Sequence, residues 1–210
     1  MKLFSSSALV FSVLIFFILI AGFLAGGCAG TVETVEKEAI YNLPASKSLA
    51  DSKVLRPGLS VIYYTGLKRE TKHLDQLPLT SEGKPGKPIT ILNHQSGYGE
   101  VFDSGQNEWV GMKITGYIQF PEPGIYRFQA KTNDGFRLFL ADRLIIEDPK
   151  YHADRYSDPG WVHVPEAGWY PLKILYFQGE MTSTLKLYWK KPGDDKRKII
   201  PAEAYGHLPS

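Results

Sequence analysis

The sequence predicts an all-β fold, an antiparallel sandwich or barrel, that follows an apolar export signal and a flexible tether. From residue 58 onward, apolar and polar side chains alternate in many short segments, as in strands with one buried face. Turn residues such as Pro192 and Gly193 separate these segments, and no convincing helical periodicity interrupts them. The fold class follows from these observations, whereas the order of strands stays open.

The first 27 residues have the pattern of an export signal peptide. Lys2 precedes a long apolar run that ends in the small residues Ala25, Gly26 and Gly27. Cys28, the only cysteine of the chain, comes next. This arrangement resembles a bacterial lipoprotein cleavage box, which implies a lipidated Cys28, although Ala25 stands where such a box usually has leucine. A retained transmembrane anchor and ordinary cleavage are the alternatives.

Residues 28–57 are expected to be the lipidated cysteine and a flexible tether, because they are polar, mixed in charge and without sustained periodicity. Residues 58–206 are expected to be the folded domain, which is long enough to be stabilised by its core without disulfides. We therefore expect an exported protein that is lipid-anchored to a bacterial membrane, either the outer membrane or the cell surface.

The charge balance argues against a nucleic-acid partner. The chain has 24 Lys and Arg residues against 22 Asp and Glu residues, and the two signs are interspersed. A single cysteine excludes an internal disulfide and a thiolate zinc cluster. The five histidines are scattered, without the spacing of a transition-metal site.

The strand candidates follow one another along the chain, with one long interruption. They are residues 59–64, 109–120, 125–132, 136–140, 144–146, 161–164, 169–177 and 184–190. Residues 65–99 are expected to be a polar, proline-containing insertion. The tryptophans lie in or beside the strand candidates, so packing in the core or on a sheet is their expected role: Trp109, Trp161, Trp169 and Trp189.

The most informative segment is residues 124–148, in which a polar corner interrupts two alternating strand patterns. The corner is Asn133, Asp134 and Gly135, which offers carboxylate and amide oxygens on a turn that can take positive φ. Such a corner can hold a small ligand or a cation, and Asp134 is the best single candidate. An ordinary hairpin turn is the competing interpretation.

A second candidate is the loop of residues 147–160, which contains Tyr151, Asp154 and Tyr156. Aromatic rings stack on the apolar faces of sugars, while carboxylates and arginine bind hydroxyl groups. The same loop carries further charged side chains: Asp148, His152, Arg155 and Asp158. A solvated connection between strands is the competing interpretation.

Five blocks, in order, resemble the anthrax protective-antigen domain family. They are Gly58-Leu59 with Tyr63-Tyr64, residues 109–118, residues 124–148, residues 167–193, and Ile199-Ile200-Pro201. The resemblance implies a β-barrel-like sandwich found in bacterial glycosidases, toxins and cell-surface adhesins. Many members of that family act as carbohydrate-binding modules.

The resemblance also implies a possible calcium ion as cofactor. The sugar-binding adhesins of the family hold calcium with two consecutive aspartates, which match Asn133 and Asp134. Calcium requires six to eight oxygen ligands, and Asn133 keeps an oxygen but removes one negative charge. An asparagine of a second adhesin loop falls near Gln178, and Glu180 is an alternative ligand in that loop.

We therefore predict a membrane-anchored carbohydrate-binding module of the cell envelope, with a glycan or polysaccharide as partner. Its expected ligand-binding residues are Asn133, Asp134, Tyr151, Asp154, Tyr156, Gln178 and Glu180. The alternative is a structural or protein-interaction module of the envelope without a sugar site. An enzyme is not expected, because no phosphate loop, nucleophile elbow or metallohydrolase helix occurs. Paired carboxylates among Asp134, Asp148 and Asp154 are the one conceivable exception.

Overall fold

The structure is a computed structural model that describes residues 40–44, 54–79 and 83–209. The predicted export signal, Cys28 and residues 29–39 and 45–53 of the predicted tether lie outside the described residues. Within the described part of the chain, no helix is long and apolar enough to cross a membrane.

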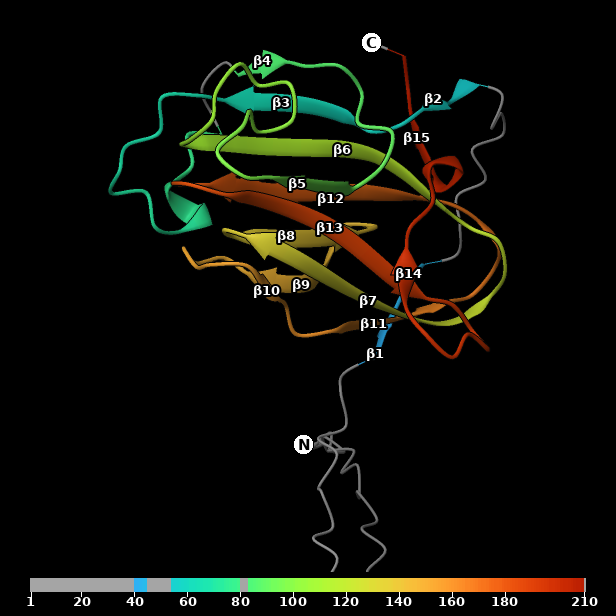
Figure 1. The fold of residues 1–210 in the computed structure, drawn as a ribbon. Helices are drawn as coiled ribbons and strands as arrows, with labels where there is room; N and C mark the ends of the chain where they lie inside the picture. Colours follow the sequence, from blue (N-terminus) through green and yellow to red (C-terminus); the bar gives the residue numbers. More distant parts are fainter. Residues whose placement is uncertain (1–39, 45–53, 80–82, 210) are drawn as a thin grey trace, which may run out of the picture. The chain divides into compact units, whose positions relative to one another are not determined.

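Two β-sheets form the described domain (Figure 1). Sheet A has the order β1-β11-β7-β13-β14, with β10 beside β7 and β5 beside β13. Its strands are β1 (Ile40–Asn42), β5 (Asn93–Ser96), β7 (Gly124–Asn133), β10 (Arg155–Tyr156), β11 (Gly160–Val164), β13 (Ser183–Lys190) and β14 (Lys198–Ile199).

Sheet B has the order β2-β15-β6-β12-β8-β9, with β3 paired to β6 and β4 paired to β3. Its strands are β2 (Arg56–Pro57), β3 (Ser60–Tyr64), β4 (Lys84–Pro85), β6 (Val110–Phe120), β8 (Phe136–Leu140), β9 (Arg143–Asp148), β12 (Gly168–Gln178) and β15 (Tyr205–His207). The described domain also contains two short 3-10 helices, η2 (Leu74–Gln76) and η3 (Ala202–Ala204). The pairs are antiparallel except β1 with β11, which is parallel.

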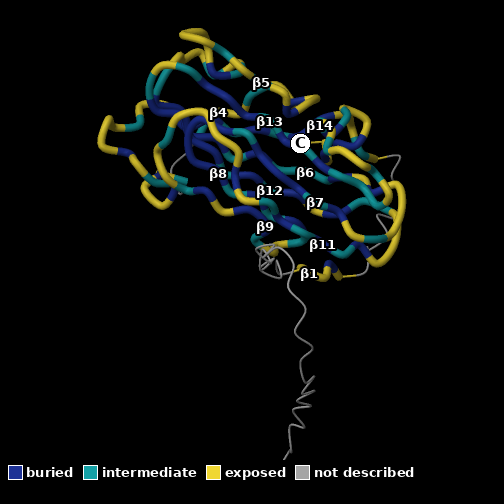
Figure 2. Tube along the Cα trace, turned by 60° about the horizontal axis from the view of Figure 1, so that its bottom comes forward, coloured by how far each residue is buried: buried dark blue, intermediate teal, exposed yellow. Residues whose placement is uncertain are grey.

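The core lies between the two sheets, where alternate residues of the long strands turn inward (Figure 2). Phe120 is fully buried at its centre, with its ring centroid 4.7 Å from that of Tyr126 and 5.3 Å from that of Tyr170. Each fully buried large apolar side chain contributes roughly 1.5–3 kcal/mol. A core of this extent stabilises the domain without a disulfide.

The predicted all-β fold class is confirmed. Every strand candidate of the sequence corresponds to a strand whose ends lie within two residues of the predicted ones. The alternation was reliable because the long strands each have one face on the core, which repeats every second residue.

The structure differs from the prediction in two segments that were expected to be irregular. The predicted tether contains β1, and Leu43 just after it is buried, so ordered structure begins before residue 58. The predicted insertion contains β5, in which Asn93 lies opposite Lys186 of β13. These strands are too short to show a period, and only their neighbours in the sheet define them.

Candidate functional site

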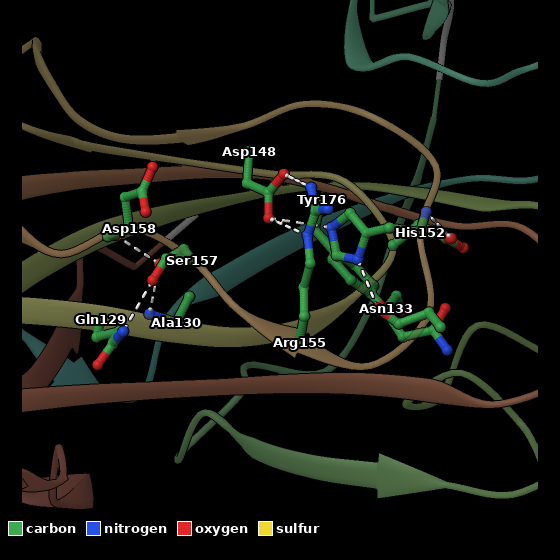
Figure 3. Close-up of polar contacts among 11 residues, drawn as sticks. Gln129, Ala130, Asn133, Asp148, His152, Arg155, Ser157, Asp158 and Tyr176 are labelled. Carbon is green, nitrogen blue, oxygen red and sulfur yellow. Dashed lines mark hydrogen bonds and ion pairs between the residues drawn. The ribbon is translucent and has the colours of Figure 1, made fainter.

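The polar corner is held against strand β12 by three hydrogen bonds. The main-chain N–H of Asp134 donates to the carbonyl oxygen of Phe177 at 3.1 Å, and Phe177 N–H donates to that of Gly135 at 3.0 Å. The buried Tyr176 hydroxyl donates to the carbonyl oxygen of Asn133 at 2.6 Å (Figure 3). These three hydrogen bonds make the corner a fixed part of the sandwich. The Asn133–Asp134 peptide bond is cis.

The Asp134 side chain is 1% exposed and connects two loops. Its Oδ1 accepts a hydrogen bond from the main-chain N–H of His152 at 2.9 Å. Its Oδ2 accepts one from Gly179 N–H at 2.7 Å. Burial raises the pKa of Asp134 above its usual value, although both N–H donors and the nearby Lys72 and His152 act in the opposite direction. Asp134 thus positions the loops after β9 and β12.

Two other predicted residues of the corner are also buried. Asn133 is 7% exposed, and its Nδ2 donates to the Thr182 hydroxyl at 2.9 Å. Gln178 is fully buried, with Nε2 3.5 Å from the Thr182 carbonyl oxygen and Oε1 without a hydrogen-bond partner. Both side chains lie beside Thr182 in the loop after β12.

Tyr151 and Glu180 lie at the outer edge of the same corner. A Cβ on Gly179 would lie 2.5 Å from the Tyr151 ring and 3.3 Å from Asp134 Oδ2, so the tyrosine packs directly over this glycine. Burial and the nearby carboxylates of Asp134 and Glu180 raise the pKa of Tyr151. The Glu180 carboxylate lies 3.9 Å from Arg69 Nε. The structure therefore brings five of the predicted residues together here.

Of the remaining two predicted residues, Asp154 is hydrogen-bonded to Asn133 beside the corner, whereas Tyr156 lies farther along sheet A. Asp154 Oδ2 accepts hydrogen bonds from Thr184 Oγ1 at 3.0 Å and from Lys131 Nζ at 3.1 Å. Partial burial would raise the pKa of Asp154, but hydrogen bonds from Lys131, Thr184 and Asn133 hold it below its usual value. Tyr156 belongs to the face of sheet A that is turned away from the core, where its ring lies beside Tyr188.

The charged residues of the loop after β9 are engaged with one another (Figure 3). Arg155 donates to both carboxylate oxygens of Asp148, through Nε to Oδ2 at 3.0 Å and through Nη2 to Oδ1. His152 Nε2 lies 3.2 Å from Asp148 Oδ2. Asp134, Asp148 and Asp154 each hold structural partners, so their geometry is not that of an acid and nucleophile pair facing a common space.

An open hollow of about 700 Å³ lies beside the corner, and we call it the corner hollow. Its lining residues are Gly66, Leu67, Tyr98, Gly105, Gln106, Asn107, Glu108, Trp109 and Met181. The N–H of Trp109 donates to the carbonyl oxygen of Gly179 at 2.8 Å, which joins the hollow to the loop that Asp134 holds. Tyr98 is 71% exposed and Met181 is 54% exposed.

Trp109 is the most unusual residue of the corner hollow. Its side chain is largely buried, yet its indole Nε1 has no hydrogen-bond partner among the described residues. Trp109 and Met181 both have left-handed backbones, with φ of 56° and 69°. Such conformations in non-glycine residues are uncommon and cluster at ligand sites. The Lys72 ammonium lies 5.0 Å from the Trp109 ring and 3.7 Å from the Tyr151 ring.

The sequence assigned Trp109 to packing and did not single out Tyr98, Gln106 or Asn107. These residues belong to irregular chain between β5 and β6, where no periodicity guides a prediction. The available signal was compositional, because a tyrosine, two amides and several glycines precede the first long strand. Only the folded chain shows that they surround one hollow.

The model of the PA14 domain family matches residues 55–203. The chain belongs to the PA14 domain family. The family expected from the sequence is thereby confirmed at the level of the PA14 domain, whereas the lipoprotein-type signal stays a prediction.

Solved structures resemble this PA14 domain at low sequence identity. The PA14 domain of the antifreeze protein MpAFP is 15% identical, covers 73% of this chain and 92% of that one, and gives a TM-score of 0.59. A PA14 sugar-binding domain from an RTX adhesin is 16% identical, covers 72% and 98%, and gives 0.57. The epithelial adhesin 6 A domain from Candida glabrata, in complex with Galβ1-3GlcNAc, is 13% identical, covers 73% and 88%, and gives 0.56.

An anti-sigma factor domain-containing protein is similar at 20% identity over 73% of the chain, with a TM-score of 0.61. The chain spans about half of that protein, because the match covers 48% of it. A comparison with curated protein sequences finds no match. Identities this low establish a shared fold and do not carry the binding site of those proteins over to this PA14 domain.

The corner of this PA14 domain does not fit a calcium ion. Both oxygens of Asp134 accept main-chain N–H groups, the amide nitrogen of Asn133 donates to Thr182, and Lys131 neutralises Asp154. Calcium needs six to eight oxygens, commonly from several carboxylates. In the part of the chain that the structure describes, no three His, Cys, Asp or Glu side chains are grouped to hold a metal ion.

Proposed function

We propose that this PA14 domain is a carbohydrate-binding module of the cell envelope, without catalytic activity, and that it binds glycan in the corner hollow. The observation that carries the proposal is Trp109, which lines the hollow with a left-handed backbone and an unpartnered indole N–H. Similar structures support the ligand class, since one is a sugar-binding domain and another is a complex with a galactose-containing disaccharide.

The lining chemistry of the corner hollow suits a sugar. The exposed ring of Tyr98 offers a surface for the apolar face of a pyranose. The Glu108 carboxylate accepts from Met181 N–H at 3.2 Å and has further lone pairs for sugar hydroxyls. The amides of Gln106 and Asn107 supply both donors and acceptors. Asp134 acts as a positioning residue, because it holds the Gly179 loop from beneath.

We propose that export and lipid attachment at Cys28 tether the domain to a bacterial membrane, with a retained transmembrane anchor as the alternative. The apolar segment and its following cysteine support this tether. We also propose that glycan binding does not require calcium, since both carboxylate oxygens of Asp134 already accept main-chain N–H groups.

A glycan array probed with the full chain in neutral detergent tests the proposal. The parent is expected to bind one or more neutral glycans equally in calcium and in EDTA. Tyr98→Ala and Trp109→Phe are expected to weaken that binding about tenfold, because they remove a stacking surface and a buried donor. The matched control is Trp161→Phe, which changes an indole on sheet A, away from the hollow.

An array empty under both conditions, with a folded protein, would overturn the proposal and favour a structural or protein-interaction module with an envelope protein as partner. Equal loss in Trp109→Phe and Trp161→Phe would also count against the corner hollow. Loss confined to EDTA would show that calcium takes part after all.

A further inference from the structure

The face of sheet A that is turned away from the core carries a group of cations. Along β7 and β13 the inward residues are apolar and buried, among them Phe128 and Leu187. The residues between them point outward. We call this surface the cationic face, and its cations are Arg127, Lys131, Lys186, Lys190 and Arg197.

Cations lie opposite one another across the two strands. Arg127 of β7 is the register partner of Lys190 on β13, and Lys131 is that of Lys186. Like charges in directly opposite positions destabilise an antiparallel pair. The chain has nearly as many acidic as basic residues, yet none of these four strand positions carries a carboxylate. The repulsion is therefore a feature that an anionic partner would relieve.

Most of this charge has no partner within the described domain. Asp154 pairs with Lys131 at 3.1 Å, and Lys186 Nζ donates to the neutral Gln95 side chain at 2.6 Å. Among the ion pairs of the described residues, none involves Arg127, Lys186, Lys190 or Arg197. The cationic face therefore keeps a net positive charge although the chain as a whole is close to neutral.

Aromatic rings hold the two arginines in place. The Arg197 guanidinium lies 4.1 Å from the Tyr156 ring and 5.4 Å from the Tyr188 ring, and it donates to Gln129 Oε1. The Arg127 guanidinium lies 5.6 Å from the Trp161 ring. Stacking of this kind orients the planar guanidinium group and leaves its other N–H donors for a bidentate bond to a carboxylate.

We propose that the cationic face binds an acidic polysaccharide, a linear polymer whose sugar rings carry carboxylates. Lys190, beside Arg127, and Lys186 have no ion pair among the described residues and are four residues apart along β13, about 13 Å at the rise of a strand, so they match charges that recur along an extended chain. The interleaved aromatic rings suit the pyranose rings between those charges.

An anionic bilayer matches the cationic face less well. The guanidinium groups of Arg127 and Arg197 lie against rings of the sheet rather than extending from it. This second surface goes beyond the proposed function, because none of its residues lines the corner hollow.

Affinity electrophoresis of the full chain in neutral detergent tests this proposal, with polygalacturonate in the gel and neutral dextran as the comparison polymer. The parent is expected to be retarded by polygalacturonate only, and less so at high salt. Arg127→Gln combined with Arg197→Gln is expected to weaken binding about tenfold or more. The control pair is Lys113→Gln with Lys173→Gln, which removes the same charge from sheet B.

Equal weakening by the two double variants would overturn the proposal, because it would show a net-charge effect. Absence of retardation of the parent would also overturn it. A double arginine variant that loses association with phosphatidylglycerol mixed micelles, while its retardation by polygalacturonate is unchanged, would assign the face to a membrane and refute the polysaccharide. Neutral-glycan binding on the array should persist in the double arginine variant, which separates this site from the corner hollow.

Discussion

At the scale of single residues, Asp134 shows how a polar corner becomes a structural anchor. Its carboxylate is almost entirely buried and accepts two main-chain N–H groups from different loops. A buried carboxylate is tolerable only when its oxygens are hydrogen-bonded. The residue with the strongest functional signal in the sequence thus acts beneath the proposed binding surface.

Asp134→Ala is expected to lower the free energy of unfolding by about 2–4 kcal/mol, because two buried N–H donors lose a charged acceptor. Chemical denaturation of the full chain measures this change. Asp195→Ala, in the exposed turn after β13, serves as control and should change stability by less than about 0.5 kcal/mol. Equal midpoints for the two variants would show that Asp134 anchors nothing.

Asp154 gives a pH-dependent prediction. Its pKa is lower in the folded protein than in the unfolded chain, so its stabilisation is fully present above the unfolded pKa of about 3.9 and is lost as pH falls through the folded pKa. The parent is therefore expected to exceed Asp154→Asn in unfolding free energy at neutral pH. The difference should shrink below about pH 4.

Denaturant titrations of the parent and of Asp154→Asn across this range test the pH dependence. The contribution of Asp134, whose pKa is raised, is present in both proteins and cancels in the difference. A difference that stays constant down to the lowest pH would contradict the ion pair with Lys131.

At the scale of elements, the long strands and the short ones follow different rules. The long strands β6, β7, β12 and β13 carry alternation that predicts them from sequence. The short strands β1, β2, β5 and β15 each pair with a strand that is distant in the sequence. Their own residues do not reveal which strand is the partner. The distance between two backbones at such a pairing is set only when the sheet has assembled.

Gly116 marks one such approach between β6 and β15. A Cβ at this position would lie 2.5 Å from the carbonyl oxygen of Gly206 and 2.7 Å from the Leu59 side chain. Gly116→Ala is therefore expected to destabilise the domain by about 1–3 kcal/mol through displaced backbone.

Gly97→Ala is the matched control for this substitution. No atom lies within 4 Å of the added methyl group there, so stability should be unchanged or slightly higher. Thermal unfolding of both full-chain variants provides the comparison. A common melting temperature would mean that β15 does not pack on β6 as described.

At the scale of the whole molecule, the sandwich separates two surfaces with different chemistry. The corner hollow combines aromatic, amide and carboxylate groups, whereas the cationic face combines arginine, lysine and aromatic rings. The near-neutral composition conceals the cationic face, because the cations of β7 and β13 come side by side only on folding. Under the two proposals, these surfaces would allow one domain to engage neutral and acidic glycans independently.

Calcium binding is also tested on the whole molecule. A ligand at a hundred times its dissociation constant stabilises the folded state by about 2.7 kcal/mol, which would raise the melting temperature by several degrees. Because both carboxylate oxygens of Asp134 already accept main-chain N–H groups, the full chain is expected to melt within about 1 °C in calcium and in EDTA. A clear increase in calcium would show that the corner accepts the ion.

The sequence by itself determined the all-β class, the long strands, the polar corner and the resemblance that leads to the PA14 family. These follow from local patterns, since alternation and turn chemistry act between residues near in the chain. Only the tertiary structure decided that Asp134 is buried, that Tyr156 lies away from the corner and that Trp109 faces a hollow. It also decided that cations of β7 and β13 lie side by side. The physical reason is that burial and neighbours depend on which distant strands pair, and no period within one strand specifies its partner.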